Sequence, residues 1–187
     1  MIKIYYADIS SIQDFESFTK EFSCARLNYV YSISDNLRKK QSVMVWWLLL
    51  KVLKEEYELL SQFDFCLNET GKWYEKNNLV NISLSHSKNI VLVGVTDNLP
   101  ISVDVEQVGD KLLSISKLYN TEENVKTSDL LELAKFWTKR ECVIKDNRVN
   151  LFTGLTVFDK CNNQYYLNIG IENHSNSLIE ILKVNID

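Results

Sequence analysis

The 187-residue sequence contains few of the residues that make chains flexible or irregular, with one proline and five glycines. This scarcity excludes long linkers and low-complexity tracts. The hydrophobic fraction of 45% and the charged fraction of 25% are those of an ordinary globular protein. A chain of this length can bury a sizeable core as one domain or as two small ones. Disordered and fibrous classes are therefore excluded.

The sequence also lacks an excess of positive charge. It has 21 Lys and Arg residues against 25 Asp and Glu residues, which gives a formal net charge of −4. General nucleic-acid binding needs a basic surface, so we expect no nucleic-acid partner. A polyanionic ligand would have to be held by a local basic cluster. The candidates for such a cluster are Arg26, Arg38, Lys39, Lys40 and Lys72, although a solvated helix face explains residues 38–40 equally well.

Signals for a zinc site, a redox motif or a membrane segment are missing as well. The four cysteines form no CxxC pair and have no metal-type spacing. The N-terminal MIKIYYADIS does not have the pattern of a signal peptide. The most apolar run, Val43 to Leu50, is far shorter than the ~20 residues of a membrane span. We therefore expect a cytoplasmic protein with reduced thiols and no membrane association.

Periodicity predicts a mixture of helices and strands. One or two amphipathic helices are expected between Ser11 and about Ser32, and a long, largely buried helix from a cap at Ser34 or Asp35 to about Leu60. Further helices are predicted over Asp110–Tyr119 and from Thr127–Asp129 to about Lys145. Strands are predicted over Met1–Ala7, Phe63–Leu67, Leu79–Ser85, Ile90–Thr96, Ile101–Gln107, Gly154–Phe158, Gln164–Gly170 and Leu178–Val184.

The order of these elements repeats, although no sequence repeat can be aligned. Each half of the chain offers one long helix and a few antiparallel strands. This predicts an α+β fold of two pseudo-symmetric halves, residues 1–98 and 99–187, with the active site in a cleft between them.

Two carboxylates stand in the predicted strand Ile101–Gln107. Strand side chains alternate, so Asp104 and Glu106 lie on one face while the intervening valines lie on the other. Two carboxylates at this spacing can share a divalent hard cation such as Mg²⁺. The alternative is a solvated sheet face that carries two charges, which on alternation alone is favoured.

A second candidate is a stripe on the last predicted helix. Trp137, Glu141 and Lys145 are spaced four residues apart and therefore lie along one side of the helix. The carboxylate suits a third metal ligand or a base, and the lysine suits a phosphate. On spacing alone, an exposed Glu–Lys pair on an amphipathic helix is the favoured alternative.

A third candidate is the polar end of the strand that leads to Ser85-His86-Ser87. A histidine at a strand end, flanked by hydroxyls and backbone amides, suits an anionic ligand. The same residues are also common in a simple turn. A Ser-His-Asp hydrolase is disfavoured because there is no GxSxG elbow.

In this order, the three candidates resemble the signature blocks of 4′-phosphopantetheinyl transferases of the surfactin-synthetase-activating type. Those blocks read approximately Ser-His-Ser, Gly-(Ile/Val)-Asp-(Ile/Val)-Glu and Trp-(Ser/Thr)-x-Lys-Glu-(Ala/Ser)-x-x-Lys. The resemblance covers roughly Arg26 to Lys145 and includes Asp35-x-x-Arg38 and Gly71-Lys72. This sequence departs from the pattern with Ser102 for Gly, Arg140 for Lys, Cys142 for Ala or Ser, and no glycine after Lys145.

The resemblance implies a transferase that moves the 4′-phosphopantetheine group of coenzyme A onto a serine of an apo acyl or peptidyl carrier protein, releasing 3′,5′-ADP. It implies Mg²⁺ bound by Asp104, Glu106 and Glu141. Glu141 would also be the general base for the acceptor serine, and Lys145 would bind the phosphates and assist the leaving group. The family folds as two similar α+β halves with the site between them.

The resemblance also implies a set of residues that bind coenzyme A. These are Ser85 and His86 at the phosphates, Arg26, Arg38 and Lys39 at the 3′-phosphate, and Gly71 and Lys72 near the adenine. We expect a monomer. The carrier protein, whether of fatty-acid, polyketide or nonribosomal-peptide synthesis, is not indicated. The alternatives are a homologue that binds coenzyme A or a carrier protein without catalysis, and a Mg²⁺-dependent phosphodiesterase or nuclease.

Overall fold

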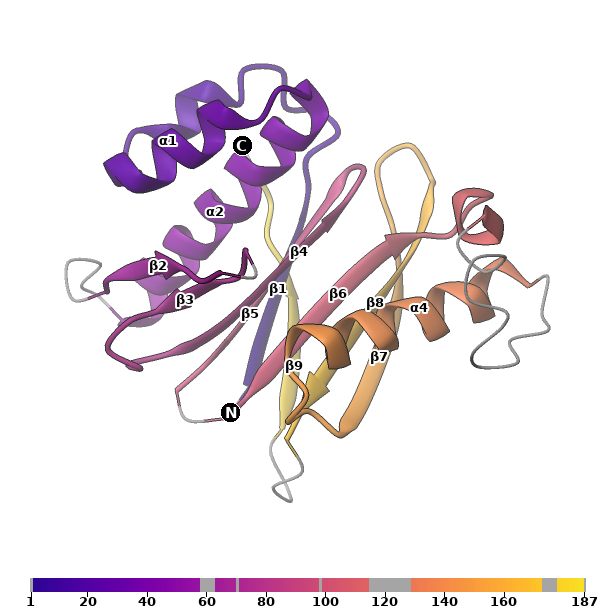
Figure 1. Cartoon of the computed structure of the whole chain (residues 1–187). Helices are drawn as coiled ribbons and strands as arrows, with labels where there is room; N and C mark the ends of the chain where they lie inside the picture. Colours follow the sequence, from indigo (N-terminus) through magenta and orange to yellow (C-terminus); the bar gives the residue numbers. More distant parts are fainter. Residues whose placement is uncertain are drawn as a thin grey trace.

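A computed structural model describes residues 2–57, 63–69, 71–97, 99–114, 129–172 and 178–186, and these residues form an α+β fold (Figure 1). The first sheet has the strand order β4-β5-β1-β9. Its strands are β1 (Ile2–Asp8), β4 (Asn81–Ser87), β5 (Ile90–Thr96) and β9 (Ile179–Lys183). β1 pairs antiparallel with β5 and parallel with β9, so the end of the chain returns to the sheet that its beginning forms.

The second sheet is antiparallel and has the order β6-β8-β7. Its strands are β6 (Ile101–Gln107), β7 (Leu151–Phe158) and β8 (Gln164–Ile171). Helix α4 (Leu130–Lys145) packs on β6 and β8. Asp129 caps α4, because its carboxylate accepts hydrogen bonds from two amides of the first turn, and the helix therefore begins at the end of the predicted range of 127–129. The predicted boundary between residues 98 and 99 falls where the chain passes from β5 to β6.

Helix α2 (Asn36–Tyr57) packs on the first sheet (Figure 1). Asp35 caps it, because its Oδ1 accepts a hydrogen bond from the Arg38 amide at 2.7 Å. Apolar residues of the helix, Val43, Leu48 and Leu49 among them, form the core between α2 and the sheet. A small antiparallel sheet of β2 (Phe65–Leu67) and β3 (Trp73–Glu75) lies beside the helix. Strand β3 has no counterpart among the predicted strands.

The segment from Ser11 to Ser32, for which the spacing predicts one or two amphipathic helices, is divided between two short helices. It contains a short 3-10 helix, η1 (Glu16–Thr19), and helix α1 (Cys24–Ser32). Ser23 starts α1, because its hydroxyl accepts from the Arg26 amide. The apolar residues that suggested a helix all pack into the α2 core nevertheless: Ile12, Phe15, Phe18 and Phe22. Of the predicted helix over 110–119, residues 111–114 are helical and Asp110 lies in the turn before them. Residues 115–119 lie outside the described residues, as does the predicted end of α2 near residue 60.

The two large sheets share a second apolar core. One face of the first sheet, with Ile4 and Leu92, packs against one face of the second, with Val103 and Leu167. Gly94 makes this approach possible, since a Cβ there would lie 2.8 Å from side-chain atoms of Ile101 and of Val103. The packing brings β4 and β6, each at an edge of its sheet, side by side (Figure 1). No helix of the described residues is long and apolar enough to cross a membrane.

Candidate active site

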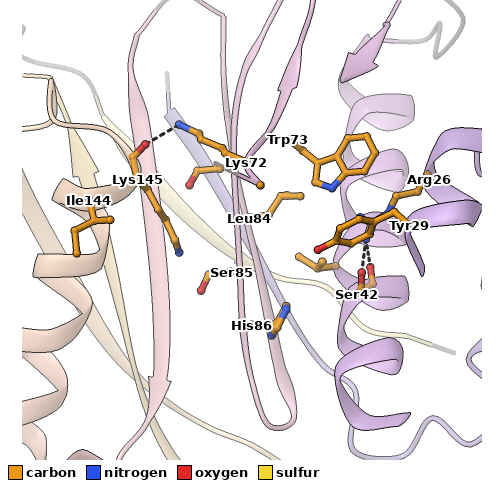
Figure 2. Close-up of a pocket in the computed structure, with 13 residues that line it drawn as sticks. Arg26, Tyr29, Ser42, Lys72, Trp73, Leu84, Ser85, His86, Ile144 and Lys145 are labelled. Carbon is orange, nitrogen blue, oxygen red and sulfur yellow. Dashed lines mark hydrogen bonds between the residues drawn. The ribbon is translucent and has the colours of Figure 1, made fainter. Parts of the chain in front are cut away.

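A pocket of about 520 Å³ opens beside β4, where α1, α2, the loop before β3 and the end of α4 meet (Figure 2). Six of the predicted site residues line it: Arg26, Gly71, Lys72, Ser85, His86 and Lys145. A groove of about 840 Å³ adjoins it and shares Tyr29, Ser42 and His86 with it. The groove contains two more of the predicted residues, Arg38 and Glu106. Residues from Arg26 to Lys145 therefore meet along one concave surface.

Asp104 is buried under the site, with an exposed fraction of 5%. Its Oδ1 accepts hydrogen bonds from Lys145 Nζ at 2.7 Å and from Ser85 Oγ at 2.8 Å. Its Oδ2 is also buried and has no hydrogen-bond partner among the described residues. The face of β6 that carries Asp104 is thus not solvated, and the alternative of a charged surface strand is wrong for this residue.

Glu106 lies half-buried two residues further along β6. Its Oε2 accepts a hydrogen bond from Ser87 Oγ at 2.8 Å. Burial raises the pKa of Glu106, the hydrogen bond from Ser87 opposes this rise, and the negative charge of Asp104 adds to it. The two carboxylates thus lie on the same face of β6, as the alternation predicts, and each is bound to a serine of β4.

The last turn of α4 is tied to β6 through Lys145. Besides Asp104, Lys145 Nζ donates to the Val103 carbonyl oxygen at 2.9 Å. The favoured alternative for the stripe, an exposed pair of Glu141 and Lys145, is therefore wrong, since Lys145 is paired with a buried carboxylate instead. Glu141 is half-buried and lines neither cavity. Burial raises the pKa of Glu141, and the charge of Asp104 raises it further.

The carboxylates of Asp104, Glu106 and Glu141 have the donor chemistry that Mg²⁺ prefers. The charge of Asp104 reaches both of the others, and its unpartnered buried Oδ2 is a free acceptor. These features fit a divalent cation. In the part of the chain that the structure describes, however, no three His, Cys, Asp or Glu side chains are already gathered as a metal centre. The cation on Asp104 in this arrangement is the ammonium group of Lys145.

Arg26 is held inside an aromatic cage. Only 2% of the residue is exposed, and Nη2 donates to the carbonyl oxygen and the hydroxyl of Ser42 at 2.6 and 2.7 Å (Figure 2). The guanidinium lies 4.5 Å from the ring centre of Trp46, 4.9 Å from that of Tyr29 and 5.2 Å from that of Trp73. Burial lowers the pKa of Arg26 to about 10, so it remains a cation at neutral pH. Arg26 is thus a fixed charge in the wall of the pocket.

Lys72 reaches across the pocket to the end of α4. Gly71 before it has a φ of +81°, a conformation that suits glycine. Lys72 Nζ donates to the Lys145 carbonyl oxygen at 3.1 Å (Figure 2). It also lies 3.9 Å from Asp146 Oδ2. Burial lowers the pKa of Lys72, while Asp146 opposes this. Gly71, Lys72 and the catalytic candidate Lys145 therefore border the same space.

The remaining predicted residues differ in how available they are to a ligand. His86 lies in the wall common to both cavities, and part of its side chain is exposed there. Desolvation of the ring by the surrounding protein lowers the pKa of His86, and the positive charge of Lys145 lowers it further, which favours the neutral imidazole. The hydroxyl of Ser85 is already used within the protein. Arg38 is exposed in the groove. Lys39 lines neither cavity, and its Nζ lies 6.0 Å from the ring centre of Tyr31.

Several residues of the site were not predicted. The aromatic residues around Arg26 come from three elements, and only Tyr29, one turn away on α1, gives a local signal. Ser87 was predicted only as part of the polar end of β4, and not as a partner of Glu106. The alternation of serines is the signal for that role, because Ser83, Ser85 and Ser87 fall on one face of the strand. Asp146, which directly follows the helix stripe, contacts Lys72.

No protein-family model matches this sequence, and no curated protein matches it either. Function is therefore inferred from the sequence motifs and from the residues that the fold brings together.

Proposed function

We propose that this chain is a 4′-phosphopantetheinyl transferase, which moves phosphopantetheine from coenzyme A onto a serine of an apo acyl or peptidyl carrier protein. One observation carries the proposal. Ser85, Asp104 and Lys145, one from each of the three sequence blocks, form a single hydrogen-bonded set. They stand 19 and 41 residues apart in the chain, so no local folding rule brings them together.

The cavities have the size and the chemistry for coenzyme A. Their volumes of about 520 and 840 Å³ lie within the usual range of ligand sites. Lys72, Lys145 and the caged Arg26 supply positive charge for phosphates in a protein that is acidic as a whole. The rings of Tyr29 and Trp73 supply a flat apolar surface beside them. We assign the pocket to the adenine and the diphosphate of coenzyme A. The groove, which contains Arg38, is assigned to the 3′-phosphate and the remainder of the molecule.

The reaction needs a base, and Glu141 is placed in that role. The serine oxygen of the carrier protein forms a bond to the phosphorus that bears pantetheine, and the bond from that phosphorus to the ADP oxygen breaks. Glu141 accepts the serine proton, and its raised pKa suits it to do so. Lys145 offsets the negative charge that develops on the departing 3′,5′-ADP.

Asp104, Glu106 and Glu141 would hold Mg²⁺. When bound, the cation supplies charge neutralisation and orientation of the diphosphate. The protein's own contribution is to orient the two carboxylates of β6, with Asp104 held by Ser85 and Glu106 held by Ser87, while Glu141 would be supplied by α4.

The two-half arrangement is part of the proposal. A first half is built on α2 and the first sheet, a second pseudo-symmetric half on α4 and the second sheet, and the active site lies in the cleft between them. The support is that each long helix packs on its own sheet and that the pocket is lined from α1, α2 and α4. We further propose that the transferase acts as a monomer in the cytoplasm.

The test is release of 3′,5′-ADP. The purified protein is incubated with coenzyme A, Mg²⁺ and a panel of apo acyl and peptidyl carrier proteins, and 3′,5′-ADP is quantified by chromatography. The proposal expects release only when both a matching carrier protein and the divalent cation are present, and none in excess chelator. Binding of coenzyme A without release from any carrier would indicate the non-catalytic homologue instead. Release without a carrier would indicate a phosphodiesterase.

A further inference from the structure

Serine side chains join the edges of the two large sheets. Strand β4 pairs its main chain with β5, and β6 pairs with β8, so β4 and β6 meet along their other edges. Three serine hydroxyls of β4 accept hydrogen bonds from β6 amides along this seam. Ser83 Oγ accepts from Val103 N at 2.9 Å, Ser85 Oγ from Val105 N at 3.3 Å, and Ser87 Oγ from Gln107 N at 3.1 Å. The hydroxyls thus take the place of carbonyl oxygens between two unpaired edges.

Two of these serines also donate their single proton to a carboxylate. Ser85 Oγ donates to Asp104 Oδ1 and Ser87 Oγ to Glu106 Oε2, both at 2.8 Å. The register is the same at both serines. Each serine accepts from the amide of one β6 residue and donates to the side chain of the β6 residue that precedes it. Ser83 has the same amide contact, but the equivalent side chain is Ser102, which is not a carboxylate.

We propose that Ser85 and Ser87 are positioning residues that fix the orientation of Asp104 and Glu106 for divalent-cation binding. This inference rests on the proposed function, in which those carboxylates are ligands. One oxygen of each carboxylate is held by a serine, which leaves the other oxygen for the cation, and Asp104 Oδ2 is buried without a partner among the described residues. Hydrogen bonds of this kind set the orientation of ligating carboxylates and thereby their affinity for metal.

The seam contains its own control. Ser87→Ala removes an amide acceptor and the carboxylate contact, whereas Ser83→Ala removes an amide acceptor alone. Because Ser83 also lines the pocket assigned to coenzyme A, affinity for Mn²⁺ is measured by electron paramagnetic resonance at a coenzyme A concentration that saturates each variant, together with the melting temperature. Ser87→Ala is expected to weaken Mn²⁺ binding about tenfold. Ser83→Ala is expected to leave the affinity for Mn²⁺ unchanged. Both variants are expected to lower the melting temperature by similar amounts.

Two further variants separate positioning from folding. Ser87→Thr keeps the hydroxyl and is expected to retain the affinity for Mn²⁺. In a Glu106→Ala background, Ser87→Ala is expected to cause no additional loss, because the serine acts through that carboxylate.

The inference is overturned if Ser87→Ala and Ser83→Ala bind Mn²⁺ equally well, since the seam then only joins the sheets. A wild-type protein that binds no Mn²⁺ would instead overturn the proposed ligand set, and the positioning role with it. The two failures are distinguishable because the second is seen before any variant is made.

Discussion

Replacing Lys145 by methionine tests the ion pair that ties α4 to the candidate site. Lys145 Nζ donates to Asp104 Oδ1 at 2.7 Å and to the Val103 carbonyl oxygen at 2.9 Å. The side chains of Lys145 and Asp104 are 24% and 7% exposed. Methionine keeps most of the stem and removes the charge. The buried carboxylate is then left with the Ser85 hydroxyl as its remaining donor among the described residues.

The expected magnitude follows from that burial. Exposed ion pairs contribute up to about 1 kcal/mol, whereas removing one partner of a buried pair costs about 3–5 kcal/mol. Since this pair has one well-buried and one partly exposed member, we expect Lys145→Met to lower the free energy of unfolding by about 2–3 kcal/mol at neutral pH. Adding Asp104→Asn removes the uncompensated charge. The double variant is therefore expected to be about 1–2 kcal/mol more stable than Lys145→Met.

The assay is urea unfolding monitored by tryptophan fluorescence, and α4 offers a matched control. Lys135 Nζ lies 2.7 Å from Glu132 Oε1, but these two side chains are 41% and 54% exposed. Lys135→Met is expected to change the stability little. The reasoning would be refuted if Lys145→Met were no more destabilising than Lys135→Met, or if the double variant were less stable than Lys145→Met.

Three further predictions follow from the site and the sheets. Glu141→Gln should lower transfer by about 10²-fold or more while coenzyme A binding measured by calorimetry is retained, because a base is lost; near-normal transfer would contradict the assignment. Arg38→Ala should raise the KM for coenzyme A with little change in kcat, and an equal effect on 3′-dephospho-coenzyme A would show that Arg38 does not contact the 3′-phosphate. Burial by itself would raise the pKa of Asp159. Hydrogen bonds from two asparagines and a tyrosine outweigh this effect and lower the pKa from 3.8 to about 2. The stability that this charge supplies is present above pH 3.8 and is lost as the pH falls through 2. Asp159→Asn should therefore lower the free energy of unfolding, measured with urea, by about 2 kcal/mol at pH 7 and by little near pH 2.

Local signals predicted much of the fold. Asp35 caps α2 as expected, and the alternation of apolar residues in β6 places Val103 and Val105 in the core, opposite Asp104. The cap and the alternation both depend on residues close together in the chain, so their patterns can be recognised in the sequence. The failures concern segments whose form depends on distant partners. Phe15 and Phe22 reach the α2 core from positions just outside η1 and α1, and the short strand β3 is paired with β2.

The same distinction applies to the candidate site. Alternation shows that Asp104 and Glu106 share a face, but it does not show that α4 covers that face and buries Asp104. The seam between β4 and β6 also lies beyond sequence reasoning, because it requires two sheet edges to meet. Ser87 therefore appeared only as part of a polar strand end, and its contact with Glu106 is a product of the fold.

The most direct test of the central claim is the intact mass of an apo carrier protein after incubation with this protein, coenzyme A and Mg²⁺, followed by peptide mapping. Phosphopantetheinyl transfer predicts a gain of one phosphopantetheine group, located on a single carrier serine, in at least one member of a panel of acyl and peptidyl carriers. The gain should disappear with Glu141→Gln. Carriers that all keep their apo mass, while a known transferase converts the same panel under the same conditions, would contradict the claim.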